Sequence, residues 1–316
     1  MAGFVKRPLG WLIALIVAVF AHAGPAFAQD AAKPAQVPDA VTKAIADAVP
    51  EADKVTVGAY INDIHELDFR SHTYSVDLYI WFRWKNAAAN PVKSMEFMNR
   101  YNPTDHQRDT LLDEPKKMPD GSLYGIIREQ GRFASKFRLE KYPFDAQSLK
   151  IVFEDTVASV ALQTYSAAPD AVSANPDIQL PGYKVAAPRM TVSENRYPTN
   201  FGDISLANNE TYSRVTIDVP VTRPLITVSI KTFVPILLII MSATLVLFVR
   251  PGFVEGRIGL AITALLTLVA LQLTASASLP EVDYLMLIDK AYLASYAFII
   301  AVLTRVVVTS WVGDGG

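Results

Sequence analysis

One apolar segment in the last third of the sequence carries a stripe of residues whose types and spacing could let ions pass. Residues that recur at every third or fourth position share one face of a helix. The stripe consists of Gly259, Thr263, Leu266, Ala270, Leu273 and Ala277. The hydroxyl of Thr263 could meet a hydrated ion, and a ring of Leu266 side chains could close the path by excluding water. Small residues and threonines also serve ordinary helix–helix packing, so the spacing alone leaves both interpretations open.

Other residues with chemical potential do not form a recognisable catalytic or metal-binding pattern. The absence of cysteine excludes disulfides, thiolate metal sites and cysteine nucleophiles. His65, Glu66 and His72 lack the H-E-x-x-H spacing of a zinc site, which favours a loop. There is no Ser-His-Asp order, no phosphate-binding loop and no dinucleotide motif, and the net charge of -2 does not suit a nucleic-acid partner. We therefore expect no enzyme activity, metal, cofactor or nucleic-acid partner.

The stripe lies in the second of three apolar segments that are long enough to cross a membrane. Residues 232–249 and 258–280 carry no charged side chain, and residues 291–312 carry only Arg305. About 20 such residues span the hydrocarbon core as a helix. We expect a pore domain over residues 223–316, with helices at about 225–249, 257–279 and 288–312.

The start of the sequence is typical of an export signal. Lys6 and Arg7 precede a short apolar stretch, and an Ala-x-Ala site ends at Ala28. This pattern predicts a signal peptide over residues 1–28, with an uncleaved signal anchor as the alternative. The next domain then lies outside the cytoplasm, and Arg250 and Arg257 fall on the inner side, as the positive-inside rule requires. We expect a multi-pass protein of the bacterial inner (plasma) membrane, surrounded by lipids, with this domain on the periplasmic or extracellular side.

Residues 29–222 show the alternation of apolar and polar side chains that is typical of β-strands. Strands are expected at residues 55–62, 74–84, 123–128, 132–139, 148–153, 183–192 and 211–219, after a short helix at 39–49. Many short strands separated by turn residues indicate a β-sandwich. Trp81 and Trp84 point to opposite faces of their strand, so one belongs to the core and the other could line a cleft between subunits.

Several segments resemble the pentameric ligand-gated ion channels of the Cys-loop superfamily. In residues 256–282, Arg257 opens the helix, Leu266 lies at its middle and Leu279-Pro280 closes it, as in the second membrane helix of that family. Tyr142-Pro143-Phe144-Asp145 is similar to the family's aromatic-Pro-Phe-Asp loop, with Ser135 and Leu149 where animal members have two cysteines. Further matches are residues 57–60 and 74–84, Arg223 and Pro235. The resemblance covers roughly residues 54–311.

The resemblance implies an all-β extracellular sandwich followed by an α-helical transmembrane bundle, with five copies around a pore. Agonist binding between neighbouring sandwiches would move the segment after the second helix. The family's fourth membrane helix is missing, so we expect a truncated product or a fragment. Residues 95–102 do not match the family's Trp-x-Pro-Asp agonist loop, which leaves the agonist open as a small molecule or an ion.

The same resemblance assigns candidate roles. The expected gating interface comprises Tyr142, Pro143, Phe144, Asp145, Arg223 and Pro280, with Asp145 and Arg223 as a bidentate pair rather than two solvated charges. Candidate agonist-binding residues are Tyr79, Trp81 and Tyr212. A ring of Glu255 predicts cation selectivity, although the adjacent Arg257 could neutralise part of its field. The expected function is a subunit of a homopentameric, cation-selective, ligand-gated channel; the alternative is a non-conducting membrane-anchored sensory or binding protein with the same sandwich.

Overall fold

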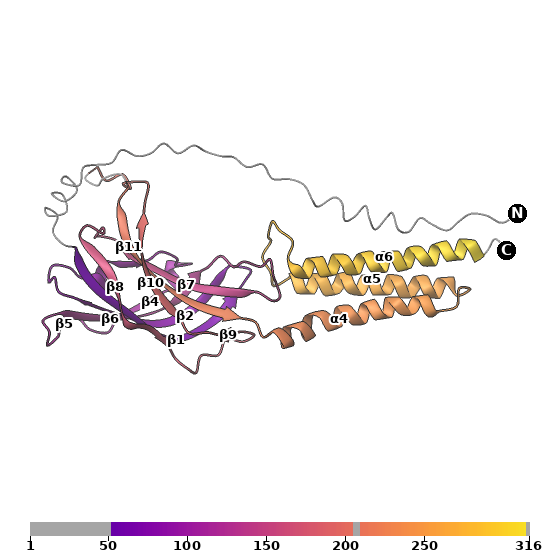
Figure 1. Ribbon diagram of the computed structural model, residues 1–316, viewed down its shortest axis with the longest axis horizontal. Helices are drawn as coiled ribbons and strands as arrows, with labels where there is room; N and C mark the ends of the chain where they lie inside the picture. Colours follow the sequence, from indigo (N-terminus) through magenta and orange to yellow (C-terminus); the bar gives the residue numbers. More distant parts are fainter. Residues whose placement is uncertain (1–51, 205–208, 314–316) are drawn as a thin grey trace, which may run out of the picture. The chain divides into compact units, whose positions relative to one another are not determined.

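The computed structural model describes residues 52–204 and 209–313, which form a β-rich domain followed by three long helices (Figure 1). The expected signal peptide and the expected short helix at 39–49 lie outside the described residues. The β-rich domain contains two sheets, and the predicted sandwich is confirmed.

The first sheet has six strands in the order β4-β6-β2-β1-β8, with β5 beside β6. Its members are β1 (Asp53–Asp68), β2 (Thr73–Trp84), β4 (Gln107–Thr110), β5 (Lys116–Lys117), β6 (Leu123–Ala134) and β8 (Gln163–Ala174). The second sheet has five strands in the order β10-β11-β7-β3, with β9 beside β11. Its members are β3 (Met95–Phe97), β7 (Ala146–Asp155), β9 (Lys184–Val185), β10 (Arg189–Arg196) and β11 (Thr211–Thr222). Two short helices, α3 (Pro91–Ser94) and η2 (Pro103–Asp105), lie between β2 and β4.

Aromatic rings from both sheets form the core of the sandwich. Phe82 of β2 meets Phe153 of β7 edge to face at 6.2 Å, and Phe97 of β3 meets Phe133 of β6 at 5.2 Å. Period-two alternation explains this, because every second side chain of a strand faces the other sheet. Trp84 is the buried member of the tryptophan pair, at 2% exposure, and its Nε1 donates to the Ala89 carbonyl. Trp81 lies on the opposite face and remains partly exposed.

The strands differ from the prediction in several places. The expected strand at 183–192 is divided into β9 and β10, and the short strands β3, β4 and β5 were not expected. The expected strands at 123–128 and 132–139 are one strand, β6, which pairs along its whole length with β2. The sequence did not indicate β8, because its run of Ala, Ser and Asp has few β-branched or aromatic residues. β8 is an edge strand, so one of its sides has no hydrogen-bonded neighbour in the sheet. Pro169, which has no backbone N–H to donate, is tolerated in such a strand. It pairs in parallel with β1, with an irregularity between Val57 and Ala59.

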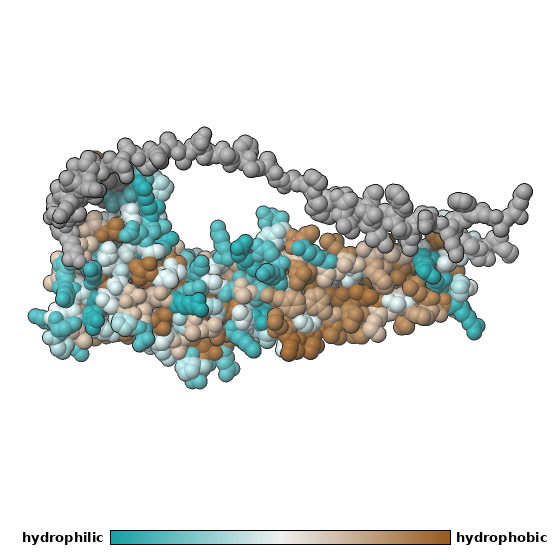
Figure 2. Space-filling model, viewed as in Figure 1, coloured by the Kyte–Doolittle hydropathy of each residue, from teal (hydrophilic) through white to brown (hydrophobic). Residues whose placement is uncertain are grey.

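Three helices of the described residues are long and apolar enough to cross a membrane. They are α4 (Leu225–Leu245), which continues as the short helix η3 (Val246–Phe248), α5 (Val254–Ser276) and α6 (Leu287–Gly313). Figure 2 shows hydrophobic residues gathered over these helices and hydrophilic residues spread over the strands. The protein is therefore a membrane protein. α5 begins three residues earlier than the sequence indicated, because helical geometry resumes directly after the turn at Pro251 and Gly252.

Candidate functional site

One face of α5 is not covered by the other two helices. Leu266 and Leu273 are 63% and 67% exposed, whereas Ala264 and Leu268, on the opposite face, are 5% and 0% exposed. The remaining members of the predicted stripe, Gly259, Thr263, Ala270 and Ala277, are also exposed. Ala277 caps the C-terminal end of the helix rather than lying within it. The structure thus places the whole stripe on the one side of α5 that lacks a partner within the chain.

Two further threonines extend this face. Thr267 and Thr274 are exposed, each one turn beyond a stripe residue, a spacing of four that sequence reasoning could have used. The hydroxyls of Thr263, Thr267 and Thr274 donate to the carbonyl four residues earlier, at 2.8 to 2.9 Å. Because each hydroxyl proton is used in this way, the oxygen lone pairs remain to accept. Oxygen acceptors along the face suit a cation or its hydration water.

At the N-terminal end of α5, the two charged side chains have different environments. Glu255 is exposed in the first turn, where the helix dipole favours a carboxylate. Arg257 is only 3% exposed. Its guanidinium donates to the Val246 carbonyl and to the Thr309 hydroxyl, both at 3.3 Å. Arg257 therefore links α5 to η3 and α6, and its side chain is turned into the bundle. Its nearness to Glu255 in the sequence overstated how far it would neutralise the field of that carboxylate.

The junction between sandwich and helices contains a buried ion pair. Arg223, directly before α4, donates from Nε to Oδ1 of Asp145 at 2.9 Å. The side chains are 15% and 1% exposed. Gln147 donates to the other carboxylate oxygen at 2.6 Å. The contact is a single hydrogen bond rather than the expected bidentate pair, because Gln147 holds the second oxygen.

Three aromatic rings surround the same guanidinium. Its central carbon lies 5.0 Å from the ring of Phe69, 4.9 Å from Tyr142 and 4.7 Å from Tyr183. These residues come from the β1–β2 turn, the loop before β7 and the segment before β9, so Arg223 joins three loops. Burial raises the pKa of the Tyr142 and Tyr183 hydroxyls, which keeps both rings neutral. Sequence reasoning missed Phe69 and Tyr183 as partners of Arg223.

The loop before β7 also forms the N-terminal cap of α6. The first N–H groups of a helix have no partner within it. Leu287 donates its N–H to the Glu140 carbonyl at 3.0 Å, and Ile288 donates to the Tyr142 carbonyl at 3.1 Å. The Leu139 N–H in turn donates to the Tyr284 hydroxyl at 2.9 Å. Backbone carbonyl groups of the sandwich therefore accept the first two N–H groups of α6.

The remaining residues of the predicted interface lie in this region. Pro143 is buried and follows a cis peptide bond. Phe144 stacks on Phe233 of α4, with ring centres 5.7 Å apart. Pro280, after α5, borders a hollow of about 900 Å³ that also includes Arg70 and His72 from the β1–β2 turn. The segment after α5 thus has free space on one side.

The three candidate agonist residues do not converge within one chain. Tyr79 and Trp81 lie on the outer face of β2, whereas Tyr212 lies on β11 of the other sheet. The Arg128 guanidinium lies 5.4 Å from the Tyr79 ring. Trp81 covers Gly58, where an added Cβ would come within 2.1 Å of the indole.

Tyr212 belongs to an aromatic cluster that the sequence did not reveal. Tyr197 packs against Tyr212 at 5.8 Å and against Phe201 at 5.3 Å. The Tyr197 hydroxyl donates to Glu154 at 2.9 Å, and Arg214 donates to the other oxygen of that carboxylate at 2.5 Å. The cluster is positioned by an ion pair between β7 and β11. Its residues are scattered over three segments, so no local motif could have indicated it.

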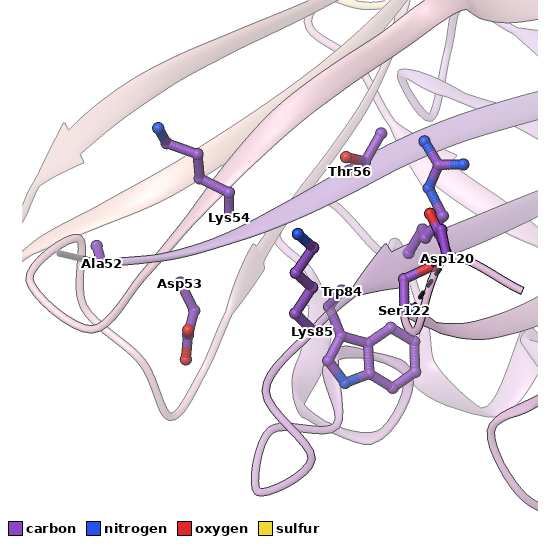
Figure 3. A pocket seen from close by; sticks show the side chains of 9 residues that line it. Ala52, Asp53, Lys54, Thr56, Trp84, Lys85, Asp120 and Ser122 are labelled. Carbon is purple, nitrogen blue, oxygen red and sulfur yellow. Dashed lines mark hydrogen bonds between the residues drawn. The ribbon is translucent and has the colours of Figure 1, made fainter. Parts of the chain in front are cut away.

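A second hollow, of about 460 Å³, lies where β1 begins and β2 ends (Figure 3). The side chains of Asp53, Lys54 and Lys85 lie well apart in Figure 3, and the hydrogen bonds drawn there join Asp120 to Ser122. Ligand sites usually have a few polar groups that converge on one point. This hollow therefore lacks the geometry of a binding site. Among the described residues, no group of three or more His, Asp or Glu side chains is placed to hold a metal ion.

A sandwich before the membrane helices, a buried ion pair at their junction and an uncovered helix face define a receptor-like membrane protein. No protein-family model matches the chain. It is 23% identical over 278 residues to the proton-gated ion channel of Gloeobacter violaceus, an alignment that covers 82% of this chain and 74% of that protein. It is 22% identical to the bovine gamma-aminobutyric acid receptor subunit alpha-2, over 83% of this chain and 62% of the receptor subunit. It is 24% identical to a Drosophila melanogaster gamma-aminobutyric acid receptor subunit beta-like protein, over 58% of this chain and 35% of that protein.

The chain is thus similar in sequence to a proton-gated ion channel and to gamma-aminobutyric acid receptor subunits, in agreement with the predicted resemblance to the Cys-loop superfamily. The relatives are channels rather than enzymes. The chain spans less than two thirds of the length of the two gamma-aminobutyric acid receptor subunits.

Proposed function

We propose that the chain is a subunit of a homopentameric, cation-selective ion channel of the bacterial inner membrane, opened by an agonist that binds to its extracellular sandwich. The observation that carries this proposal is the uncovered face of α5. Five copies around an axis would bring the Thr263, Leu266 and Ala270 faces together into a pore lining. A face used only for packing within the chain would be covered by α4 or α6, as Ala264 and Leu268 are.

The proposed cation selectivity rests on the residues at the inner end of α5. Five Glu255 carboxylates would form a ring at the pore mouth, and such rings favour cations. The direction of Arg257 supports this, because its guanidinium points into the bundle toward Val246 and Thr309, whereas Glu255 is exposed. The acceptor oxygens of the threonines add to the same preference.

An agonist site is proposed between neighbouring subunits. Tyr79 and Trp81 of one sandwich would face the aromatic cluster around Tyr197 and Tyr212 of the next, because the two groups lie on different sheets of one chain. Agonist binding would open the pore only to the extent that the open state binds it more tightly. The junction around Asp145 and Arg223 would carry the change to α4 and α6.

Cysteine scanning tests the pore directly, because the chain contains no cysteine and gives no background reaction. Thr263→Cys, Leu266→Cys and Ala270→Cys should each make the reconstituted current sensitive to a charged thiol reagent. Ala264→Cys and Leu268→Cys, on the buried face of the same helix, are the matched controls and should resist it.

Currents that respond equally to reagent at both faces would contradict the proposed pore lining. A chain that binds agonist but conducts no current would favour a non-conducting binding protein. Block at the three stripe positions alone would support the channel and fix the rotation of α5.

A further inference from the structure

A histidine and a glutamate meet inside the sandwich. His106 follows η2, and Glu129 projects inward from β6; their side chains are 2% and 0% exposed. The Phe133 ring packs edge to face on the imidazole at 5.0 Å. Gly131 makes room for it, since a Cβ there would lie 2.3 Å from Nδ1. The pair is therefore shielded from water.

Both ring nitrogens of His106 face oxygen atoms that accept hydrogen bonds. Nε2 lies 2.7 Å from the Arg132 carbonyl oxygen, and Nδ1 lies 2.9 Å from Oε1 of Glu129. A carbonyl and an ionised carboxylate can only accept, and a neutral imidazole has one N–H. Both contacts can be hydrogen bonds only when one additional proton lies between Nδ1 and Oε1.

The surrounding charges keep the Glu129 carboxyl ionised. Arg108 of β4 donates from Nε to Oε2 of Glu129 at 2.8 Å, and Arg100 lies 3.5 Å from Oε1. Burial opposes ionisation of Glu129, but the hydrogen bonds from His106 and Arg108 outweigh it and hold the pKa of this carboxyl below its usual value. The charged groups at the pair are thus Glu129 from β6, Arg108 from β4 and Arg100 from the connecting segment.

The position of His106 gives the proton a structural consequence. Residues 98–105 connect β3 to His106. Met98 and Asn99 are bonded to β7, and Asn99 and Tyr101 are bonded to β6, so the first half of this segment is held without His106. Residues 102–105, by contrast, bond among themselves in the turn at η2, and His106 attaches this turn to β6. Loss of the proton would set a lone pair of Nδ1 against the carboxylate, or leave the Arg132 carbonyl without its imidazole partner.

We propose that the His106–Glu129 pair is a buried proton-binding site that fastens residues 102–105 to β6 when occupied and releases them when the proton leaves. Release would loosen the turn at η2 directly before β4, so that pH regulates this part of the sandwich. The proposal concerns the sandwich and stands whether or not the chain conducts ions.

Hydrogen–deuterium exchange of the full chain in lipid nanodiscs tests this proposal. Protection factors, corrected for the intrinsic pH dependence of exchange, are followed for residues 102–105 between about pH 5 and about pH 8, where imidazoles titrate. Wild-type protection should rise roughly fivefold toward acid, the factor that one hydrogen bond of ordinary strength supplies. A flat profile in the wild type would overturn the proposal.

Two substitutions change the proton requirement in defined ways. His106→Asn places an amide N–H near Glu129 at every pH, so protection should become independent of pH. Glu129→Gln offers an N–H to Nδ1 of a neutral imidazole, so protection at the neutral end should match that at the acid end. His65→Asn is the matched control, because His65 is half exposed, and should keep the wild-type profile. Persistence of the pH dependence in His106→Asn would equally overturn the proposal, even if Glu129→Gln fails to fold.

Discussion

Removal of either partner of the Asp145–Arg223 pair should have unequal effects. In Arg223→Ala, the Asp145 carboxylate stays 1% exposed and keeps only the amide of Gln147 as a side-chain donor. A buried charge that loses its partner costs about 3 to 5 kcal/mol. In Asp145→Ala, the guanidinium keeps its three aromatic rings, and each cation–π contact contributes about 0.5 to 2 kcal/mol. Arg223→Ala should therefore be the more damaging change.

The double variant measures the coupling of the two residues. A hydrogen bond between charged groups contributes about 1.5 to 3 kcal/mol, which corresponds to roughly a tenfold to hundredfold departure from additivity in an equilibrium constant. The exposed pair Arg138–Glu140, at 3.3 Å on the same loop, is a matched control. Its side chains are 86% and 45% exposed, so its coupling should be at most about 1 kcal/mol.

Two assays are needed to separate gating from folding. Thermal unfolding of the reconstituted protein reports on stability, and the agonist concentration for half-maximal current, with surface expression controlled, reports on the closed–open equilibrium. A coupling that occurs in both assays assigns the pair to gating, whereas a coupling in stability alone makes it a structural contact. Strictly additive effects in both assays, or equal losses in the two single variants, would refute the reasoning.

Four further predictions follow from other contacts. Leu266→Ser should hydrate the pore and lower the agonist concentration needed for opening, and an unchanged response would place the gate elsewhere. Glu255→Gln should move the reversal potential in a salt gradient toward the chloride potential; if it stays at the cation potential, the ring does not select. Tyr284→Phe removes the acceptor of the Leu139 N–H and should destabilise the chain by about 1 to 3 kcal/mol, while an unaltered unfolding midpoint would argue against this bond. Burial raises the pKa of the Asp77 carboxyl, but the hydrogen bonds from Arg128 outweigh burial and lower this pKa. The stabilisation that the carboxylate contributes should therefore be present above about pH 4 and be lost as the pH falls through the pKa of the folded state. Asp77→Asn should remove that acid dependence of unfolding.

The main elements were predictable because their patterns are local. The three membrane helices followed from their uncharged length, β1 from alternation and β2 from its β-branched and aromatic residues, since these signals depend only on neighbouring residues. β8 gave no such signal, because an edge strand next to β1 can be stabilised by pairing despite small and polar side chains. Local sequence patterns therefore indicate the helices and strands whose side chains are well buried. They fail for a strand such as β8, whose formation depends on pairing with its neighbour.

The candidate site divides in the same way. The stripe of α5 was visible because its spacing lies within one helix. The pairing of Asp145 with Arg223, 78 positions apart, came from the family resemblance and not from any pattern. The rings of Phe69 and Tyr183 and the His106–Glu129 pair come from loops and strands that only the folded chain brings together. The direction of Arg257 relative to Glu255 was missed because the helix was expected to begin at residue 257. In α5, which begins at Val254, both residues lie on one helix, and side chains two positions apart do not share a face.

The contacts at the junction are distributed unevenly among the three helices, and this distribution bears on where motion would occur. α6 begins on two backbone hydrogen bonds from the sandwich, and α4 follows the buried guanidinium of Arg223. The C-terminal end of α5 and the segment that follows it, which includes Pro280, instead border a hollow of about 900 Å³. Segments with few buried contacts open at lower free energy than well-packed ones. A displacement of the loop before β7 would therefore move α4 and α6 together with the sandwich. The C-terminal end of α5 would then change its position relative to these two helices. That helix also carries the proposed pore lining, so the least restrained helix at the junction is the one that the proposed pore requires to move.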